Sequence, residues 1–463
     1  MAITGEFVRH DRSAQFREYA ERRARGAVET PPLQLPAHER RQHVRHTLRE
    51  DHRERIENRP DGAQRKFDAL AADAFTFFRG TALLYYRDHA GTDVHLPVVF
   101  SVGDVHPENF GVMVNSAGGP FFGVNDFDEA WPAPFSYDVK RGAVGFWMAA
   151  ASNGERKRDR RRVVRSFVDG YLTALRTYSA DDRSSSFQFR VDNSPKIIRK
   201  LLERARTDRR EFLDSLIDLE TSTFRPSRKR VPESSQVVQF QDVVDRYVTE
   251  NDLGGPARPE SFFRVLDVAR KKGSGTGSLG LDRYWVLLEG WDVDPARSVV
   301  IEFKRTRRSA LYGLVPAGDL TVEEPDEQSA RRIVAAHEVH LVDGDPLYGF
   351  ADIEGRSFLV RERSPFKDEI AVSALGRGAL IEYANVCGRA VALPHARSEA
   401  ETTIRRNRVS QGAVETRILS AIVPEVFRAD VVEFAEWAAG RVYADHAMFT
   451  EDHRRGAFRY WDA

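Results

Sequence analysis

The residues of this chain that most clearly suggest chemistry lie in the segment GDVHPENFG, which begins at Gly103 directly after an apolar run. Its Asp104 and Asn109 stand five positions apart around a proline-containing loop. Phosphoryl transfer needs a carboxylate aimed at the attacking hydroxyl, and an amide oxygen that can bind magnesium without adding charge. We therefore interpret Asp104 and Asn109 as catalytic residues, with Asn109 also a metal ligand.

A second acidic segment, VNDFDEA, places Asp126 and Asp128 at the end of another apolar run. Carboxylate oxygens in such a position could hold magnesium against phosphate oxygens. Either segment alone could consist of aspartates that cap turns. The two segments in order, each after a predicted strand, favour a magnesium site formed by Asn109, Asp126 and Asp128.

A glycine-rich stretch, GTGSLG, runs from Gly275 to Gly280 between two apolar segments. Glycines allow the backbone to approach phosphates closely and to point N–H groups at them. A Rossmann turn would open into a helix, but the aromatic and β-branched residues of DRYWVLLEGW indicate a strand. We therefore predict binding of ATP phosphates by a loop between two strands, with contacts from Gly275, Gly277, Ser278 and Gly280.

The next predicted strand, VVIEFK, ends in Lys304, one of ten lysines in a chain whose basic residues are mainly arginine. A lysine at the exposed end of a strand would ordinarily be unremarkable. Its place after the glycine-rich stretch predicts a catalytic and cofactor-binding role, in which it reaches the nucleotide phosphates and pairs with a glutamate of the following helix. Glu327 and Glu338 are both candidates for that partner.

Read together, D-x-H-P-E-N and the following D-F-D resemble the catalytic and metal-binding loops of protein-kinase-like enzymes, and His106-Pro107 resembles the aminoglycoside and choline kinase branch. The resemblance implies that Asp138 supports the catalytic loop. In those enzymes the glycine loop and lysine come first, whereas here they follow about 170 residues later. This order implies a circular permutation.

The succession of motifs, from Phe78-Arg79-Gly80 through GDVHPENFG, NDFDEA and VVIEFK to HARSEA, resembles the bacterial DUF2252 family. That family is known as a domain of unknown function. The resemblance covers most of the chain, and it implies that the motifs belong to one domain without supplying a reaction. The chain departs from the family pattern at Ala336-His337-Glu338, where Gly-Gln-Arg is more usual.

Composition excludes several classes of protein. The 70 basic and 70 acidic residues leave no cationic excess for nucleic acid or an anionic membrane. Cys387 is the single cysteine, which excludes an intramolecular disulfide and fits a reducing compartment. No apolar run is long enough to span a bilayer, and the first residues do not read as a signal peptide. We expect a cytoplasmic protein that binds a nucleotide and a small-molecule acceptor; the oligomeric state stays open.

The predicted fold class is α+β, a two-lobed protein-kinase-like fold, circularly permuted and with extra helices. Residues 1–60 form a charged helical extension on the surface, 61–260 a C-lobe portion, 261–365 an N-lobe portion and 366–463 a helical region packed on the body. A largely buried helix is expected over 67–86, with Gly80 as an interruption, and a hairpin over 346–365 with its turn at Glu354-Gly355.

These expectations converge on a phosphotransferase that uses ATP and Mg²⁺, in which Asp104 orients or deprotonates an acceptor hydroxyl. Adenylyl transfer on the same scaffold and a non-catalytic nucleotide-binding regulator are the alternatives. The intact set of Asp104, Asn109, Asp126 and Lys304 favours catalysis. The segment HEVH at 337–340 is one residue short of the zinc motif H-E-x-x-H, so zinc is not expected.

Overall fold

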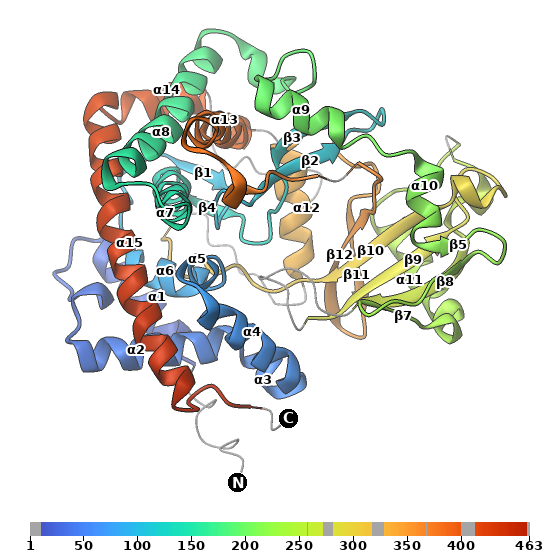
Figure 1. Ribbon diagram of the computed structural model, residues 1–463, viewed down its shortest axis with the longest axis horizontal. Coiled ribbons are helices and arrows are strands. Elements are labelled where there is room, and N and C mark those ends of the chain that lie inside the picture. Colours follow the sequence, from blue (N-terminus) through green and yellow to red (C-terminus); the bar gives the residue numbers. More distant parts are fainter. Residues whose placement is uncertain are drawn as a thin grey trace.

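The computed structural model describes residues 11–256, 258–271, 281–316, 328–366, 368–399 and 413–460. Its architecture is mixed α+β, with helices gathered on one side of the molecule and a six-stranded sheet on the other (Figure 1). Within these ranges, no helix combines the length and the apolar character that crossing a bilayer requires.

Helices form the larger part of the structure and, apart from two that pack on the main sheet, fall into three groups along the chain. The first group is α1 (Ser13–Ala24), α2 (Ala37–Asp51), α3 (Arg53–Asn58), α4 (Pro60–Ala72), α5 (Ala74–Arg79) and α6 (Ala82–His89). The second is α7 (Ser136–Ser152), α8 (Lys157–Ala180), α9 (Lys196–Arg204) and α10 (Arg209–Asp214). The third is α13 (Arg377–Ala396), α14 (Val414–Ser420) and α15 (Pro424–Arg454).

The expected buried helix over 67–86 is instead divided among α4, α5 and α6. The first break is at Asp73, whose extended backbone and side chain cap α5 by accepting the Thr76 N–H. The second break is at Gly80, as predicted. The division matters because it lets Lys66, in the middle of α4, and Arg79, at the end of α5, line the same pocket, described below.

Six antiparallel strands form the main sheet, in the order β11-β12-β10-β9-β8-β7. Their bounds are β7 (Arg230–Pro232), β8 (Val265–Lys271), β9 (Arg283–Leu288), β10 (Val299–Arg305), β11 (Gly349–Ile353) and β12 (Arg356–Glu362). The predicted hairpin is confirmed, because Glu354 and Gly355 join β11 to β12 with φ values of 56° and 71°. Such a pair of positive φ angles suits a two-residue turn between twisted strands.

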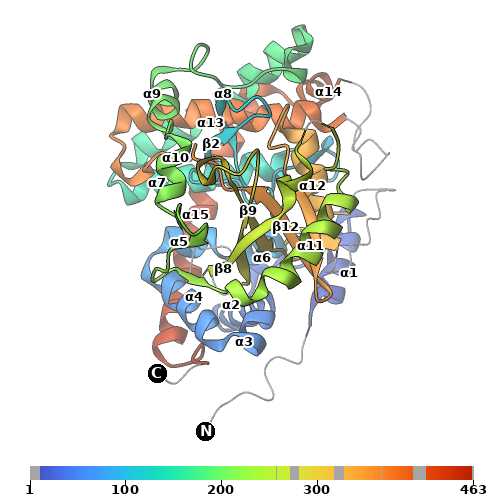
Figure 2. The same ribbon diagram turned by 90° about the vertical axis from the view of Figure 1, so that its right-hand side faces the viewer.

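Two helices cover opposite faces of this sheet. Phe358 and Val360 of β12 pack with α11 (Val237–Glu250), which lies in front of the strands in Figure 2. Leu359, between them, faces the other way and joins the core that contains α12 (Ser329–His340). Because directly paired residues share a face, Lys304 of β10, which is paired with Leu359, points to the α12 side.

The sheet begins earlier in the chain than the predicted boundary at residue 261. Strand β7 adds to β8, and the apolar side of α11 buries Phe240, Val243 and Val244 against the sheet. Residues 230–250, a polar stretch that begins in a predicted turn region, therefore belong to the sheet, because β7 pairs with β8 and α11 packs on the strands. A further short ribbon joins β5 (Ile217–Asp218) to β6 (Thr223–Phe224).

Two small strand pairs position the candidate loops. Strand β1 (Val98–Ser101) pairs with β4 (Trp131–Pro134), and β2 (Phe110–Val114) pairs with β3 (Pro120–Val124). The loop over 102–109 runs from β1 to β2, and the loop over 125–130 runs from β3 to β4. Each end of one loop therefore lies beside an end of the other, which brings the two predicted motifs together.

The N-terminal residues are helical, as expected, but they are not a surface extension. Arg40 of α2 is fully buried and forms ion pairs with Asp88 of α6 and Asp445 of α15. Val44 and Leu48 of the same helix join an apolar cluster with residues of α4 and α15. This segment therefore packs into the body of the protein through an apolar side and buried ion pairs, although most of its residues are charged or polar.

Candidate active site

The loop over 102–109 holds Asp104 in a strained, well-supported position. Asp104 has a φ of 46°, and its backbone N–H donates to the Tyr86 hydroxyl at 2.8 Å. Its carboxylate accepts from the Arg141 Nε at 2.6 Å. Burial raises the pKa of Asp104, and the Arg141 guanidinium offsets only part of that effect. Asn109 donates its Nδ2 to the Asp104 carbonyl at 3.0 Å.

Asp138 supports this loop from the first turn of α7, as the sequence suggested. Its carboxylate accepts from the N–H groups of Val102 at 2.7 Å and Gly103 at 3.0 Å. His395 of α13 contacts the same carboxylate through Nε2 at 2.9 Å, and its Nδ1 lies 2.8 Å from the Tyr171 hydroxyl. His395 is therefore a buried structural residue that acts on the loop through Asp138.

The loop over 125–130 brings two carboxylates to Lys304. The Nζ of Lys304 lies 2.5 Å from Asp128 Oδ2 and 3.7 Å from Asp126 Oδ1. Burial and the neighbouring Asp128 raise the pKa of Asp126. Burial also acts to raise the pKa of Asp128, but the Lys304 ammonium outweighs it and lowers that pKa. The predicted Lys304 and the two predicted metal ligands thus meet at one place.

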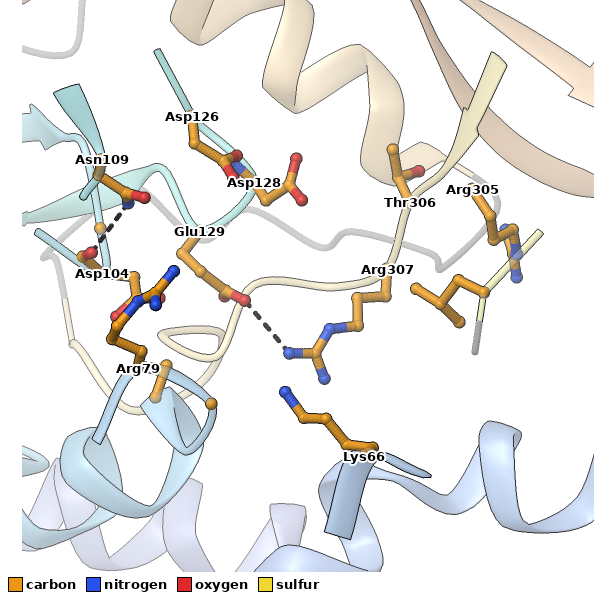
Figure 3. A pocket seen from close by; sticks show the side chains of 14 residues that line it. Lys66, Arg79, Asp104, Asn109, Asp126, Asp128, Glu129, Arg305, Thr306 and Arg307 are labelled. Carbon is orange, nitrogen blue, oxygen red and sulfur yellow. Dashed lines mark hydrogen bonds and ion pairs between the residues drawn. The ribbon is translucent and has the colours of Figure 1, made fainter. Parts of the chain in front are cut away.

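These oxygens fit a magnesium ion that is shared with phosphate. Asp128 Oδ1 is buried and has no hydrogen-bond partner among the described residues. Asn109 uses only its amide nitrogen in the bond to Asp104, and its carbonyl oxygen is turned toward Asp126 (Figure 3). In the described part of the chain, no three or more His, Cys, Asp or Glu side chains surround a common metal position. Mg²⁺ commonly takes one or two carboxylates and completes its shell with phosphate oxygens and water.

Asp104, Asn109, Asp126 and Asp128 line one pocket. Asp126 and Asp128 lie on one side of it with Asn109 beside them, and Asp104 lies next to Arg79 (Figure 3). The opposite side is cationic and comes from other elements. Its basic members are Lys66 of α4, Arg79 of α5, and Arg305 and Arg307 at the end of β10 and just after it.

Sequence reasoning missed the basic side of the pocket. Arg79 served only to mark where the family resemblance begins, and no role was predicted for its side chain. Lys66 carried a signal of the kind that singled out Lys304, because it too is one of few lysines, placed just before the apolar run FDALAADAF. Its distance of about 40 residues from Asp104 concealed the connection.

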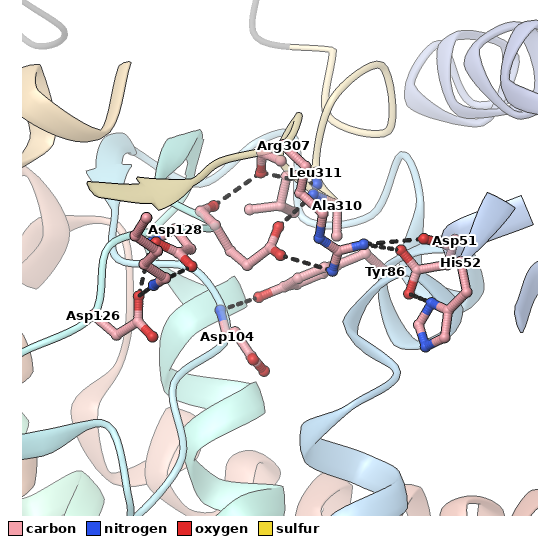
Figure 4. A network of polar contacts seen from close by, with 12 residues as sticks. Asp51, His52, Tyr86, Asp104, Asp126, Asp128, Arg307, Ala310 and Leu311 are labelled. Atoms are coloured by element: carbon pink, nitrogen blue, oxygen red, sulfur yellow. Dashed lines mark hydrogen bonds and ion pairs between the residues drawn. The ribbon is translucent and has the colours of Figure 1, made fainter. Parts of the chain in front are cut away.

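Glu129 links the acidic loop to the basic side. Its Oε2 accepts from the Ala310 N–H at 2.5 Å, and its Oε1 lies 3.4 Å from an Arg307 nitrogen. Arg307 also pairs with Asp51 of α2, so a chain of contacts runs from the N-terminal helices to the loop (Figure 4). Burial raises the pKa of Glu129 to about 7, although Arg307 opposes the shift.

The helix that follows Lys304 contributes an arginine to this region. Glu327 lies outside the described residues, and Glu338 of α12 is exposed. Within the described residues, the ion pairs of Lys304 are those with Asp126 and Asp128. Arg332 of α12 instead donates to backbone carbonyls of Asp128 at 2.9 Å, Ala130 at 2.7 Å and Arg307 at 3.3 Å.

Three other parts of the sequence considered above lie away from these contacts or outside the described residues. Cys387 is a fully buried residue of α13. His337 of the HEVH segment stacks on Tyr348 with ring centroids 3.7 Å apart, in a buried position. The predicted phosphate-binding residues Gly275, Gly277, Ser278 and Gly280 lie outside the described residues.

The fold and the site together define a mixed α+β protein in which two acidic loops meet a lysine from a neighbouring sheet. Residues 58–452 match the model of a family described as an uncharacterized protein conserved in bacteria, DUF2252, and the chain therefore belongs to that family. No curated protein and no solved structure matches the chain.

Proposed function

We propose that the protein is a phosphotransferase that uses ATP and Mg²⁺ and transfers phosphate to a hydroxyl of a small-molecule acceptor. The observation that carries this proposal is the ion pairing of Lys304 with Asp126 and Asp128, two carboxylates that line the same pocket as Asp104. A lysine and paired carboxylates next to a third, separately held carboxylate match the needs of phosphoryl transfer. The chemistry demands positioning and charge neutralisation more than covalent catalysis.

Each group has a role that follows from its surroundings. Asn109, Asp126 and Asp128 would hold the magnesium ion, which when bound neutralises charge on the phosphates. Lys304 would bind the nucleotide phosphates, because its ammonium pairs with Asp128, one of the carboxylates that would hold the magnesium ion on those phosphates. Asp104, with its carboxylate fixed by Arg141, would orient the acceptor hydroxyl and take its proton.

The proposed architecture is that of a protein-kinase-like fold whose two halves are exchanged in chain order. Strands β8 and β9 flank the glycine-rich segment, β10 carries Lys304, and α12 follows before the β11–β12 hairpin. This succession is the one expected of a nucleotide-binding half, and it follows the acidic loops in the chain. The antiparallel sheet with α12 on the Lys304 side supports this interpretation.

The products of ATP test the proposal directly. The full chain is incubated with ATP, Mg²⁺ and the small-molecule fraction of a bacterial extract, and the nucleotides are quantified by mass spectrometry. We expect ADP to accumulate with the wild type, and its rate of formation to fall at least 100-fold in Asp104→Asn and Lys304→Met. Lys157→Met, at an exposed position of α8, is the matched control and should keep the wild-type rate.

Three results would argue against phosphoryl transfer. Release of pyrophosphate instead of ADP would indicate adenylyl transfer. Binding of ATP with neither product would indicate a regulator. Equal ADP release by wild type, Asp104→Asn and Lys304→Met would show that the observed hydrolysis does not come from this site.

A further inference from the structure

The basic side of the pocket has the properties of a binding site for an anion. Lys66, Arg79 and Arg307 reach it from α4, α5 and the segment after β10, and they lie across the pocket from Asp126 and Asp128 (Figure 3). Asp104 lies on the same side as Arg79. Arg79 and Lys66 both act electrostatically on the Asp104 carboxylate, the group assigned to the acceptor, whereas Arg307 pairs with Asp51 and Glu129.

Positive charge is crowded and buried at this place. Lys66 is 1% exposed and Arg55, behind it on α3, is 2% exposed. Burial, together with the guanidinium groups of Arg55 and Arg307, holds the pKa of Lys66 well below its usual range. Burial and Arg307 likewise lower the pKa of Arg55 to about 10. Cations gathered in this way are stabilised by a bound anion.

The local backbone is shaped to present these cations. Gly80 lies against the Lys66 ammonium: a Cβ atom at this position would lie 2.4 Å from Leu70 Cδ2 and 2.8 Å from the Lys66 Nζ, so a larger residue would displace both side chains. Arg79, the preceding residue, pairs with Glu108, yet its Nε is buried without a hydrogen-bond partner among the described residues. A guanidinium with an unused N–H and a neighbouring ammonium suits the oxygens of a phosphate or a carboxylate.

We infer that Lys66 and Arg79 bind an oxyanion carried by the acceptor, whose hydroxyl is then positioned at Asp104. The inference rests on the proposed function and narrows its substrate class to hydroxyl compounds that bear a negatively charged group. The nucleotide is the other source of such an oxyanion. The placement of Lys304, Asp126 and Asp128 across the pocket assigns the nucleotide phosphates to that opposite side.

Titration calorimetry with inorganic phosphate tests the site without requiring turnover. The full chain is titrated at pH 7, first alone and then saturated with Mg²⁺ and the non-hydrolysable analogue AMP-PNP. We expect one phosphate per chain in both states, with an affinity at least tenfold weaker in Lys66→Met and in Arg79→Gln. Lys157→Met is the control for loss of a lysine charge and should bind phosphate as the wild type does.

Thermal unfolding separates binding from folding. Lys66→Met replaces a buried ammonium with an apolar chain of similar length, so its Tm should equal or exceed that of the wild type. Phosphate should raise the Tm of the wild type and leave that of Lys66→Met unchanged. Arg79, which is partly exposed, offers a second variant should Lys66→Met not fold.

Several results would overturn the inference. These are an absence of saturable phosphate binding by the wild type, unchanged affinity in both variants, or displacement of phosphate by AMP-PNP. The last result would assign the cations to the nucleotide. Failure of AMP-PNP to bind would instead refute the proposed function, while the titration of the nucleotide-free protein would still decide whether Lys66 and Arg79 form an anion site.

Discussion

Glu129 is the residue through which the acidic loop is tied to its surroundings. Its carboxylate accepts the Ala310 N–H, and its backbone carbonyl accepts the Ser309 hydroxyl at 2.9 Å. Arg307 lies between this carboxylate and Asp51 (Figure 4). Glu129 therefore anchors the end of the loop that carries Asp126 and Asp128.

Stability should therefore respond to pH through Glu129. Burial raises its pKa in the folded protein from 4.5 to about 7, so the folded state binds a proton that the unfolded state has released. Between about pH 4.5 and 7, this group makes folding less favourable as pH rises. Glu129→Gln cannot titrate at this position. The free energy of unfolding of Glu129→Gln, relative to that of the wild type, should therefore increase as pH rises. We expect a relative gain of about 2–3 kcal/mol by pH 8.

Urea unfolding at a series of pH values measures this difference. Glu18→Gln, at an exposed position of α1, is the control and should follow the wild type throughout. A difference between Glu129→Gln and the wild type that stays constant from pH 5 to pH 8 would contradict the assignment.

At the scale of elements, the loop over 102–109 is held by its close approach to the loop over 125–130. Gly103 has a φ of 68°, and a Cβ atom there would overlap the Glu129 backbone. On α7, Asp138 accepts hydrogen bonds from the N–H groups of Val102 and Gly103 and holds the same part of the loop. The geometry of Asp104 thus depends on a glycine at the preceding position.

A comparison of Gly118 with Gly103 distinguishes the stability cost of backbone strain from the cost of steric overlap, because both residues have a positive φ. Gly118, in the turn between β2 and β3, has a φ of 78°, and a Cβ atom there would meet no other atom within 4 Å. Gly118→Ala should cost about 1 kcal/mol of stability, from backbone strain alone. Gly103→Ala should cost at least about 3 kcal/mol, because the strain is joined by a clash with backbone that cannot move aside. Equal losses in chemical denaturation would show that the close approach is unimportant.

Much of this element-scale arrangement follows from the sequence. The apolar runs before Asp104 and Asp126 are strands, and Lys304 lies in the expected strand, one residue before its end at Arg305, because alternation and chain breaks are local signals. The pairing of β1 with β4 was not foreseen, since nothing local specifies which strands meet. Lys66 and Arg332 reach the site from helices that are distant in sequence. Helical periodicity shows which side of a helix is buried, but not which other segment that side will contact.

At the scale of the whole molecule, the two ends of the chain pack on each other and on the site-bearing core. Helix α15 runs from beside α8 past α2 and α4 (Figure 1). Arg40 of α2 lies between Asp88 and Asp445, with hydrogen bonds of 2.7 Å and 2.6 Å from its Nη2. Burial raises the pKa of Asp88 to about 6 even beside Arg40, so this ion pair is costly to leave incomplete.

Breaking this triad should destabilise the entire chain. Arg40→Met leaves two buried carboxylates without their cation, and we expect a loss of about 3–5 kcal/mol. Arg22→Met removes an exposed ion pair with Glu18 on α1 and should cost less than about 1 kcal/mol. Denaturant midpoints and slopes for the two variants check the prediction. A small loss in Arg40→Met would mean that the N-terminal helices contribute little to the fold.

Calorimetric titration of the full chain with AMP-PNP measures whether Asp126, Asp128 and Lys304 bind a magnesium-nucleotide complex. We predict binding by the wild type that requires Mg²⁺, at least tenfold weaker binding in Asp128→Asn and in Lys304→Met, and unchanged binding in Lys157→Met. Absence of binding to the folded wild type, or equal affinity in all four proteins, would contradict the account.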